Sequence, residues 1–278
     1  MNARPGTLPH VSAGSGEPPL VFVHGFGGSP GEWHAQLSHF APRHLTIAVD
    51  LNGSIAARME GDCAVASLGG AVAELIRERG LRRAVLIAHS LGCRIAIEAV
   101  AQMPTQVCAL ALIDGSQFPA GTESATRRQL TQGGYSSVVD LLFSAMLTPG
   151  NGASVTPAWE RAARLPADVG SRVVLDFLRW DEVKQERVLS TLRVPVLALQ
   201  ATARGPDGRR RLLERGESSP YLAMIRSAVQ DSRVVIVPDA GHFAHLDAPA
   251  EVNEALEAFI ASLTPGDSLP PTPMRTHE

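Results

Sequence analysis

Hydrophobic residues along this chain fall into short runs with few polar interruptions, separated by longer segments of helical periodicity. Strands of a parallel sheet are buried on both faces, so they lack the alternation of apolar and polar residues that half-exposed strands show. The uninterrupted runs therefore predict buried parallel strands, at 20–23, 45–49, 84–88, 109–113, 194–199 and 234–237.

Helical patterns lie between those runs. The segments 63–79 and 91–102 carry small or apolar residues at helical spacing, and further helices are predicted to begin at Pro220, after Ser219 as N-cap, and near Pro249. Alternating strands and helices predict an α/β fold with a mostly parallel central sheet and helices on both faces. In such sheets, ligands bind beyond the carboxyl ends of the strands.

The alternation of strands and helices breaks between 117 and 192, where helical patterns follow one another without strands. We interpret 117–192 as a helical insertion after the strand that ends near Asp114, covering the carboxyl edge of the sheet as a lid. The predicted core then comprises 1–116 and 193–264. The final segment, 265–278, is rich in proline and polar residues and is predicted to be disordered.

Composition narrows the possible partners and surroundings. The chain has 278 residues and a formal charge of −3, which gives no reason to expect a nucleic-acid partner. No apolar run is long enough to cross a bilayer, and the first residues lack the apolar core of a signal peptide, so we expect no membrane association and a cytoplasmic location. The three cysteines have no zinc-site spacing, and a disulfide framework is not expected.

The one basic run is Arg209–Arg210–Arg211. We interpret it as a solvated loop or helix start, with anchoring of an anionic substrate as the alternative.

The sequence AHSLG at 88–92 places Ser90 between a predicted strand and a predicted helix. A serine there could simply cap the helix. A nucleophile elbow, however, needs small residues around its serine because the turn brings backbones close together, and Gly92 and Ala88 are small. The strand–turn–helix context favours Ser90 as a nucleophile.

A serine hydroxyl needs a positioned base to remove its proton. His242 follows the last predicted strand and comes after Gly241, which permits a tight loop, so it is the predicted base. His245 lies three residues further on, and we interpret it as a hydrogen-bonded supporting residue.

An attacked carbonyl becomes an oxyanion, which preorganised backbone N–H groups can stabilise. The sequence HGFGG at 24–28 follows the first clear strand and predicts such a loop, with the amides of Phe26 and Leu91 as donors. Neither a phosphate-binding loop nor a dinucleotide-binding loop fits HGFGG, because the lysine-containing and G-x-G-x-x-G patterns are absent.

Two carboxylates are candidates for orienting the histidine. Asp114 stands at the carboxyl end of a predicted strand, whereas Asp207 lies seven residues beyond the predicted strand end at Gln200, in a Pro-Asp-Gly sequence typical of an exposed turn. Direct placement at a strand end favours Asp114, and Asp207 remains the alternative.

With these pieces in place, residues 18–263 resemble the α/β-hydrolase superfamily of small esterases, lactonases and C–C bond hydrolases. The resemblance rests on HGFGG, AHSLG, VPVLALQ and GHFAHLDAP. It implies Ser90 as nucleophile, His242 as base and the Phe26 and Leu91 amides as oxyanion hole. The sequence departs from the family pattern at Ala88, in the loop 49–58, and after Gln200, where the acidic residue of many relatives is missing.

The predicted reaction is hydrolysis of a small carboxylic ester or lactone through an acyl-enzyme, without a metal or organic cofactor. The alternatives are a C–C bond hydrolase or cofactor-free oxygenase on the same scaffold, and a non-catalytic ligand-binding module. His24, His89, Phe143 and Trp180 are the candidate substrate contacts. The charges beside Trp180, in RWDE at 179–182, are expected to point outward.

Overall fold

The computed structural model describes residues 8–52, 55 and 64–263, and its central element is a seven-stranded sheet with the order β1-β3-β2-β4-β5-β6-β9. All neighbouring strands are parallel except β1, which pairs antiparallel with β3. The predicted α/β fold with a mostly parallel sheet is confirmed. The strands are β1 (His10–Ala13), β2 (Leu20–Val23), β3 (Thr46–Val49), β4 (Ala84–His89), β5 (Val107–Ile113), β6 (Val196–Gln200) and β9 (Ser232–Ile236).

Successive residues of the central strands face two different hydrophobic clusters. In β4, Leu86 and Ala88 belong to one cluster, whereas Val85 and Ile87 belong to the other. Because side chains alternate between the two faces of a strand, a strand covered on both sides must be apolar at every position. This explains the uninterrupted hydrophobic runs of the sequence.

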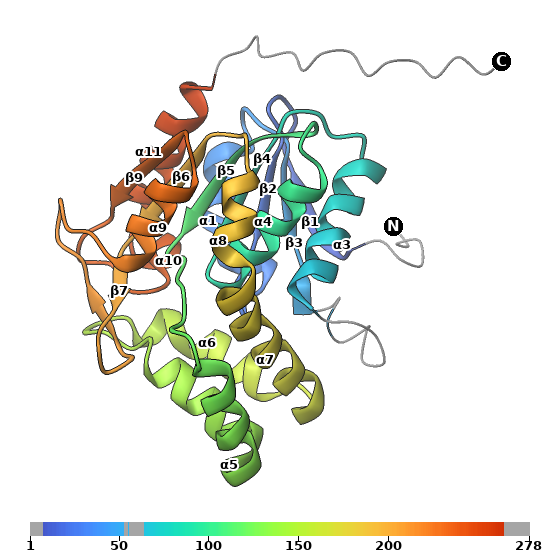
Figure 1. The fold of residues 1–278 in the computed structure, drawn as a ribbon. Coiled ribbons are helices and arrows are strands. Elements are labelled where there is room, and N and C mark those ends of the chain that lie inside the picture. Colours follow the sequence, from blue (N-terminus) through green and yellow to red (C-terminus); the bar gives the residue numbers. More distant parts are fainter. Residues whose placement is uncertain (1–7, 53–54, 56–63, 264–278) are drawn as a thin grey trace.

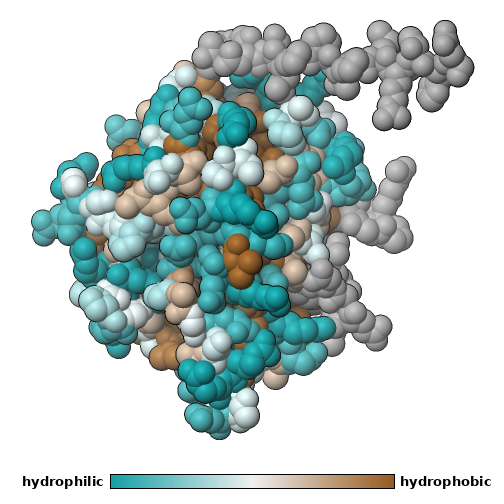
Figure 2. Space-filling view, viewed as in Figure 1, coloured by the Kyte–Doolittle hydropathy of each residue, from teal (hydrophilic) through white to brown (hydrophobic). Residues whose placement is uncertain are grey.

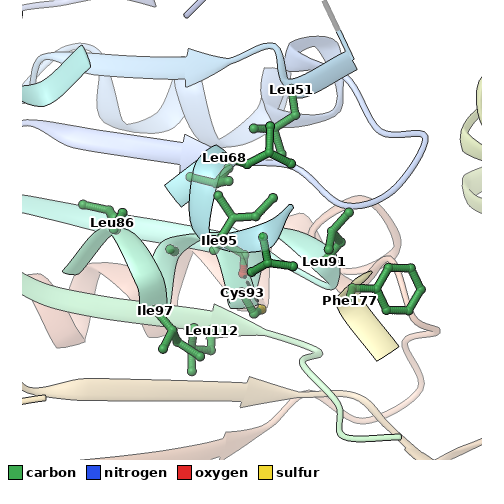
Figure 3. Close-up of a cluster of buried hydrophobic side chains, with 14 of the residues drawn as sticks. Leu51, Leu68, Leu86, Leu91, Cys93, Ile95, Ile97, Leu112 and Phe177 are labelled. Atoms are coloured by element: carbon green, nitrogen blue, oxygen red, sulfur yellow. Dashed lines mark hydrogen bonds between the residues drawn. The ribbon is translucent and has the colours of Figure 1, made fainter. Parts of the chain in front are cut away.

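Helices cover both faces of the sheet (Figure 1). On one face lie α3 (Val65–Glu78), α4 (Leu91–Gln102), α8 (Gln185–Thr191) and α9 (Pro220–Ala228); on the other lie α1 (His34–Phe40) and α11 (Pro249–Ala261). Figure 3 shows the first of these layers, with Ile95 and Ile97 of α4 in one buried cluster with Leu86 of β4 and Leu112 of β5.

Three further helices follow β5 and lie together beyond one end of the sheet (Figure 1). They are α5 (Thr122–Ser144), α6 (Gly152–Ala163) and α7 (Ala167–Val183). The fourth helix of the segment 117–192, α8, differs from them because it packs against α4 and α9 in the layer over the sheet.

Some short elements were not predicted. They are β1, η1 (Pro30–Trp33), α1, α10 (Ala244–Asp247) and the antiparallel hairpin of β7 (Thr202–Arg204) and β8 (Arg210–Leu212). Each is too short for periodicity to emerge, and β1 is an edge strand with exposed residues.

Several predictions concern residues outside the described ranges: Cys63 at the start of the helix predicted over 63–79, half of the loop 49–58, and the tail 265–278. Among the described helices, none has the length and apolar character needed to span a membrane. The face in Figure 2 is largely hydrophilic, with scattered apolar residues.

Candidate active site

The strand order places the switch in chain direction between β2 and β4. β2 lies between β3 and β4, so the chain leaves the carboxyl end of β2 toward one side of the sheet and that of β4 toward the other. Such a switch in direction is where open α/β sheets bind ligands. The HGFGG turn follows β2 and Ser90 follows β4, so both lie at this point.

Ser90 has an unusual backbone conformation for a non-glycine residue, with φ of 53° and ψ of −115°. Such a turn is strained and holds the serine above the strand end. Gly92 makes it possible, because a Cβ at that position would collide with the backbone carbonyls of Val23 and His24. Ser90 occupies the N-cap position of α4, yet its side chain makes no capping bond. Its hydroxyl is instead bonded to a histidine.

His242 connects Ser90 to a carboxylate. Its Nε2 lies 2.9 Å from Ser90 Oγ, and its Nδ1 lies 2.7 Å from Asp114 Oδ2. A carboxylate only accepts hydrogen bonds, so the neutral ring carries its proton on Nδ1 and Nε2 accepts from the serine. His89 also fixes the loop, because its Nε2 donates to the backbone carbonyl of His242 at 2.9 Å.

Asp114 is fully buried and accepts several other hydrogen bonds. Its Oδ1 accepts the backbone N–H groups of Ala201 and Thr202 at 2.9 and 2.7 Å, while its Oδ2 accepts Thr202 Oγ1 at 2.6 Å and Arg210 Nη1 at 2.9 Å. Burial raises the pKa of Asp114, and Arg210 and the Thr202 bonds oppose that rise. The carboxylate is held in one orientation from several directions.

The alternative carboxylate lies elsewhere. Asp207 Oδ1 accepts the backbone N–H of Arg209 at 3.0 Å, within the exposed turn between β7 and β8. The geometry therefore brings Asp114, and not Asp207, to His242.

The interpretation of the basic run as solvated was wrong at its middle residue. Arg209 and Arg211 are exposed, but Arg210 is buried and forms the ion pair with Asp114. Alternate residues of a strand point to opposite faces, so in β8 the middle arginine turns inward. The Pro-Asp-Gly turn before the run was a local sign of a hairpin, but the inward position of Arg210 depends on its distant partner Asp114.

Burial lowers the pKa of His242 well below its ordinary value, and the positive charges of Arg210 and Arg204 lower it further. At pH values below the ordinary imidazole pKa, the ring is therefore still neutral and can accept the serine proton. Burial also lowers the pKa values of His89 and His245 well below their ordinary value.

The two predicted oxyanion donors follow the carboxyl ends of β2 and β4. Gly25 approaches Ser90 so closely that a Cβ there would stand 3.0 Å from Ser90 Cβ. In the described part of the chain, the amides of Phe26 and Leu91 donate to no other residue. They are therefore available to an oxygen atom held beside Ser90.

His24 fixes the HGFGG turn through hydrogen bonds to the backbone. Its Nε2 accepts the backbone N–H of Leu51 at 3.0 Å, so its Nδ1 carries the proton and donates to Gly25 O at 2.8 Å. The predicted substrate contacts at His24 and His89 are fully buried, and the ring nitrogens that form bonds reach backbone groups. Both residues hold the loops of the site.

Aromatic side chains cover the turn. The ring of Phe143 in α5 stacks on Phe26 at 6.3 Å and on Trp159 of α6 at 6.0 Å, and Phe177 of α7 approaches Phe26 at 6.4 Å. Arg161 of α6 donates to the carbonyl of Gly27 at 2.6 Å. The helices beyond the sheet therefore contact the predicted oxyanion loop directly, and Phe143 lies beside it.

Trp180, another predicted substrate contact, is not brought to Ser90. Its indole N–H donates to Glu98 Oε1 at 2.6 Å, two turns along α4 from Ser90. Asp181 was expected to point outward, but it is buried and paired with Arg94. These side chains join α7 to α4.

His245 does not match the hydrogen-bonded role expected for it. It is fully buried and stacks on Trp33 with ring centroids 4.4 Å apart, but neither ring nitrogen has a hydrogen-bond partner among the described residues. The described part of the chain also contains no group of three or more His, Cys, Asp or Glu side chains that could hold a metal ion.

Comparison with known proteins adds to this geometry. A family model described as the alpha/beta hydrolase family matches residues 20–255. A Pseudomonas putida protein, the dihydrolipoyllysine-residue acetyltransferase component of an acetoin cleaving system, is 27% identical over 89% of this chain. The chain spans 64% of that relative's length and 37% of its Cupriavidus necator counterpart.

Solved structures show the same fold. A thermophilic esterase of Thermogutta terrifontis, with malate bound, has a TM-score of 0.72 and 19% identity, covering 92% of this chain and 93% of its own. An enol-lactonase of Burkholderia xenovorans has a TM-score of 0.68 and 14% identity, covering 91% and 96%.

Proposed function

Because this chain belongs to the alpha/beta hydrolase family, we propose that it is a serine hydrolase that cleaves a small carboxylic ester or lactone through an acyl-enzyme. The observation that carries the proposal is the unbroken line of hydrogen bonds from Ser90 through His242 to Asp114. Serine, base and carboxylate in this order form the arrangement that activates a hydroxyl for attack.

In the proposed reaction, His242 Nε2 takes the proton of Ser90 as Oγ forms a bond to the carbonyl carbon. The carbonyl oxygen becomes an oxyanion that accepts the N–H groups of Phe26 and Leu91. Charged His242, paired with Asp114, then gives its proton to the leaving alkoxide as the C–O bond breaks. Water repeats the sequence on the acyl-enzyme, releasing the carboxylic acid and restoring Ser90.

The aromatic cover supports a substrate with an apolar group. Phe26, Phe143 and Phe177 gather beside the predicted oxyanion loop, and apolar side chains bury an acyl or alcohol group of similar character. Esters and lactones share the carbonyl chemistry, so the proposal covers both.

The proposal is tested by replacing the nucleophile. Ser90 is partly exposed, so Ser90→Ala should keep the fold and lower turnover of p-nitrophenyl acetate by at least about 10⁴-fold. Circular dichroism and the melting temperature serve as controls for folding. A screen of acyl chain lengths and lactone ring sizes with the wild-type protein then defines the substrate. Undiminished turnover in the folded variant contradicts the proposal.

A further inference from the structure

A cavity of about 310 Å³ is lined by Arg210, the residue that donates a hydrogen bond to Asp114. Its walls come from the loop 115–119, the hairpin around 202–210 and the start of α9 at 219–221. Pro119 and Pro220 are exposed lining residues, so the cavity opens to the surface between them. Ser90, His242 and Phe26 are not among its lining residues.

Several residues that line this cavity carry buried polar atoms without hydrogen-bond partners in the described part of the chain. These atoms include the Nε atoms of Arg204 and Arg210 and the hydroxyl of Tyr221, all of which are donors. Arg210 is 6% exposed and Tyr221 is 5% exposed. Burial raises the pKa of Tyr221 well above its ordinary value, so the hydroxyl keeps its proton. Unpartnered buried donors are rare and need an acceptor to explain them.

Gln200 supplies one unpartnered acceptor at the same place. Its Nε2 donates to the carbonyls of Gly115 and Thr202 at 2.9 and 2.8 Å, which leaves Oε1 without a partner among the described residues. A hydroxyl or N–H group of a ligand would satisfy it.

The charges around the cavity do not balance. Arg94 forms a bidentate pair with Asp181, at 2.7 and 2.6 Å, and Arg210 pairs with Asp114. Arg204 is the third guanidinium and forms no ion pair with a described carboxylate. One positive charge therefore stays uncompensated.

Arg204 contacts an aromatic ring and a backbone carbonyl. Its guanidinium lies 3.7 Å from the ring centroid of Phe118, and its Nη1 donates to the carbonyl of Gly208 at 2.8 Å. Burial, together with Arg210 and Arg94, lowers the pKa of Arg204 to about 9. A bound anion would offset this repulsion.

We propose that this cavity binds a small organic anion through a carboxylate that accepts hydrogen bonds from Arg204, Arg210 and Tyr221. Guanidinium groups match the planar geometry of a carboxylate. Phe118 and Ala203 provide apolar contacts for the rest of the ligand, and the volume admits a body about the size of one ring.

The site is linked to the catalytic centre through one side chain. Arg210 lines the cavity and also holds Asp114, which orients His242. A carboxylate at Arg210 therefore reaches the carboxylate of the proposed triad through a shared guanidinium, and the cavity that would hold it does not include Ser90. Binding itself does not depend on the proposed hydrolase activity.

The test is isothermal titration of benzoate, acetate and inorganic phosphate into the full-length Ser90→Ala protein. Benzoate is expected to bind with saturation, and Arg204→Gln in the same background should weaken it at least about tenfold. Arg209→Gln is the matched control, because Arg209 belongs to the same hairpin but is exposed. Its benzoate affinity should equal that of the parent.

A second variant covers the case in which Arg204→Gln does not fold. Tyr221→Phe keeps the ring and removes only the hydroxyl, and it should weaken benzoate several-fold. Phe26→Ala, at the serine, should leave benzoate affinity unchanged.

The proposal is overturned if none of the probes binds with saturation, or if Arg204→Gln and Arg209→Gln behave alike. It is also overturned if Phe26→Ala weakens benzoate while the cavity variants do not, because the anion would then lie at Ser90. Binding of phosphate without either carboxylate overturns the carboxylate class. Absence of hydrolytic activity in the wild-type protein would contradict the proposed function and leave these binding results unaffected.

Discussion

The two sides of Ser90 are built from different interactions. On one side, Asp114 and His242 lie in a buried polar network that Arg210 and Thr202 complete. On the other side, Phe143 and its aromatic neighbours cover the predicted oxyanion loop. Hydrogen bonds and ion pairs fix atoms in particular directions, whereas apolar contacts require mainly volume. The polar side should therefore tolerate substitution far less than the apolar side.

The largest expected effect on stability is at Arg210. Arg210→Met leaves Asp114 buried without its ion-pair partner, which should lower the free energy of unfolding by about 3–5 kcal/mol. Arg209→Met, one residue away and exposed, should change it by less than about 0.5 kcal/mol. Chemical denaturation measures both. Equal effects of the two substitutions would contradict the role given to Arg210.

Conservative substitutions sharpen the comparison. Phe143 is fully buried, so Phe143→Ala should cost about 3 kcal/mol or more, but Phe143→Leu keeps most of the volume and should cost only about 1 kcal/mol. Arg210→Lys keeps the charge but loses the planar donors and should cost more than Phe143→Leu. Denaturation curves of these variants test the ranking. If Phe143→Leu proves more destabilising than Arg210→Lys, the contrast between the two sides fails.

A smaller effect, dependent on pH, is expected at His245. Burial holds its pKa well below the ordinary value, with His89 and His24 acting in the same direction and Asp114 in the opposite one. In the unfolded chain the ring binds a proton below about pH 6.5, while the folded ring stays neutral. The unfolded state then binds more protons, so stability falls as the pH drops below about 6.5.

His245→Phe removes that contribution and keeps the ring that stacks on Trp33. The pH dependence of the free energy of unfolding should become shallower by up to about 1.4 kcal/mol per pH unit below pH 6.5, with little change near pH 7.5. Denaturation at several pH values gives the slope. An unchanged slope would show that His245 titrates alike in both states.

The sequence was sufficient for the parallel sheet but not for the polar network. The strands buried on both faces are almost uniformly apolar, so β2 and β4 could be recognised from their uninterrupted runs of apolar residues. Arg210 and Asp181 are charged residues, and their burial depends on partners that lie far away in the chain, at Asp114 and Arg94. No local pattern specifies such a pairing.

The candidate site residues also divide into those that local sequence patterns predict and those that only distant contacts identify. Ser90 and His242 were found because each follows a strand end in a glycine-containing turn. Placement directly at a strand end favoured Asp114, but Asp207 remained the alternative because both residues follow strands on the same edge. Only the three-dimensional arrangement shows that Asp207 bonds within its own turn, while Asp114 faces His242.

The most direct measurement of the central claim is the rate at which a fluorophosphonate labels Ser90, followed by intact mass. This readout requires an activated serine but no knowledge of the natural substrate. Asp114→Asn, once circular dichroism shows it folded, should slow labelling at least about a hundredfold, because His242 loses the carboxylate that orients and stabilises it. Asp207→Asn should label at the wild-type rate. Slowed labelling in Asp207→Asn together with wild-type labelling in Asp114→Asn would contradict the account.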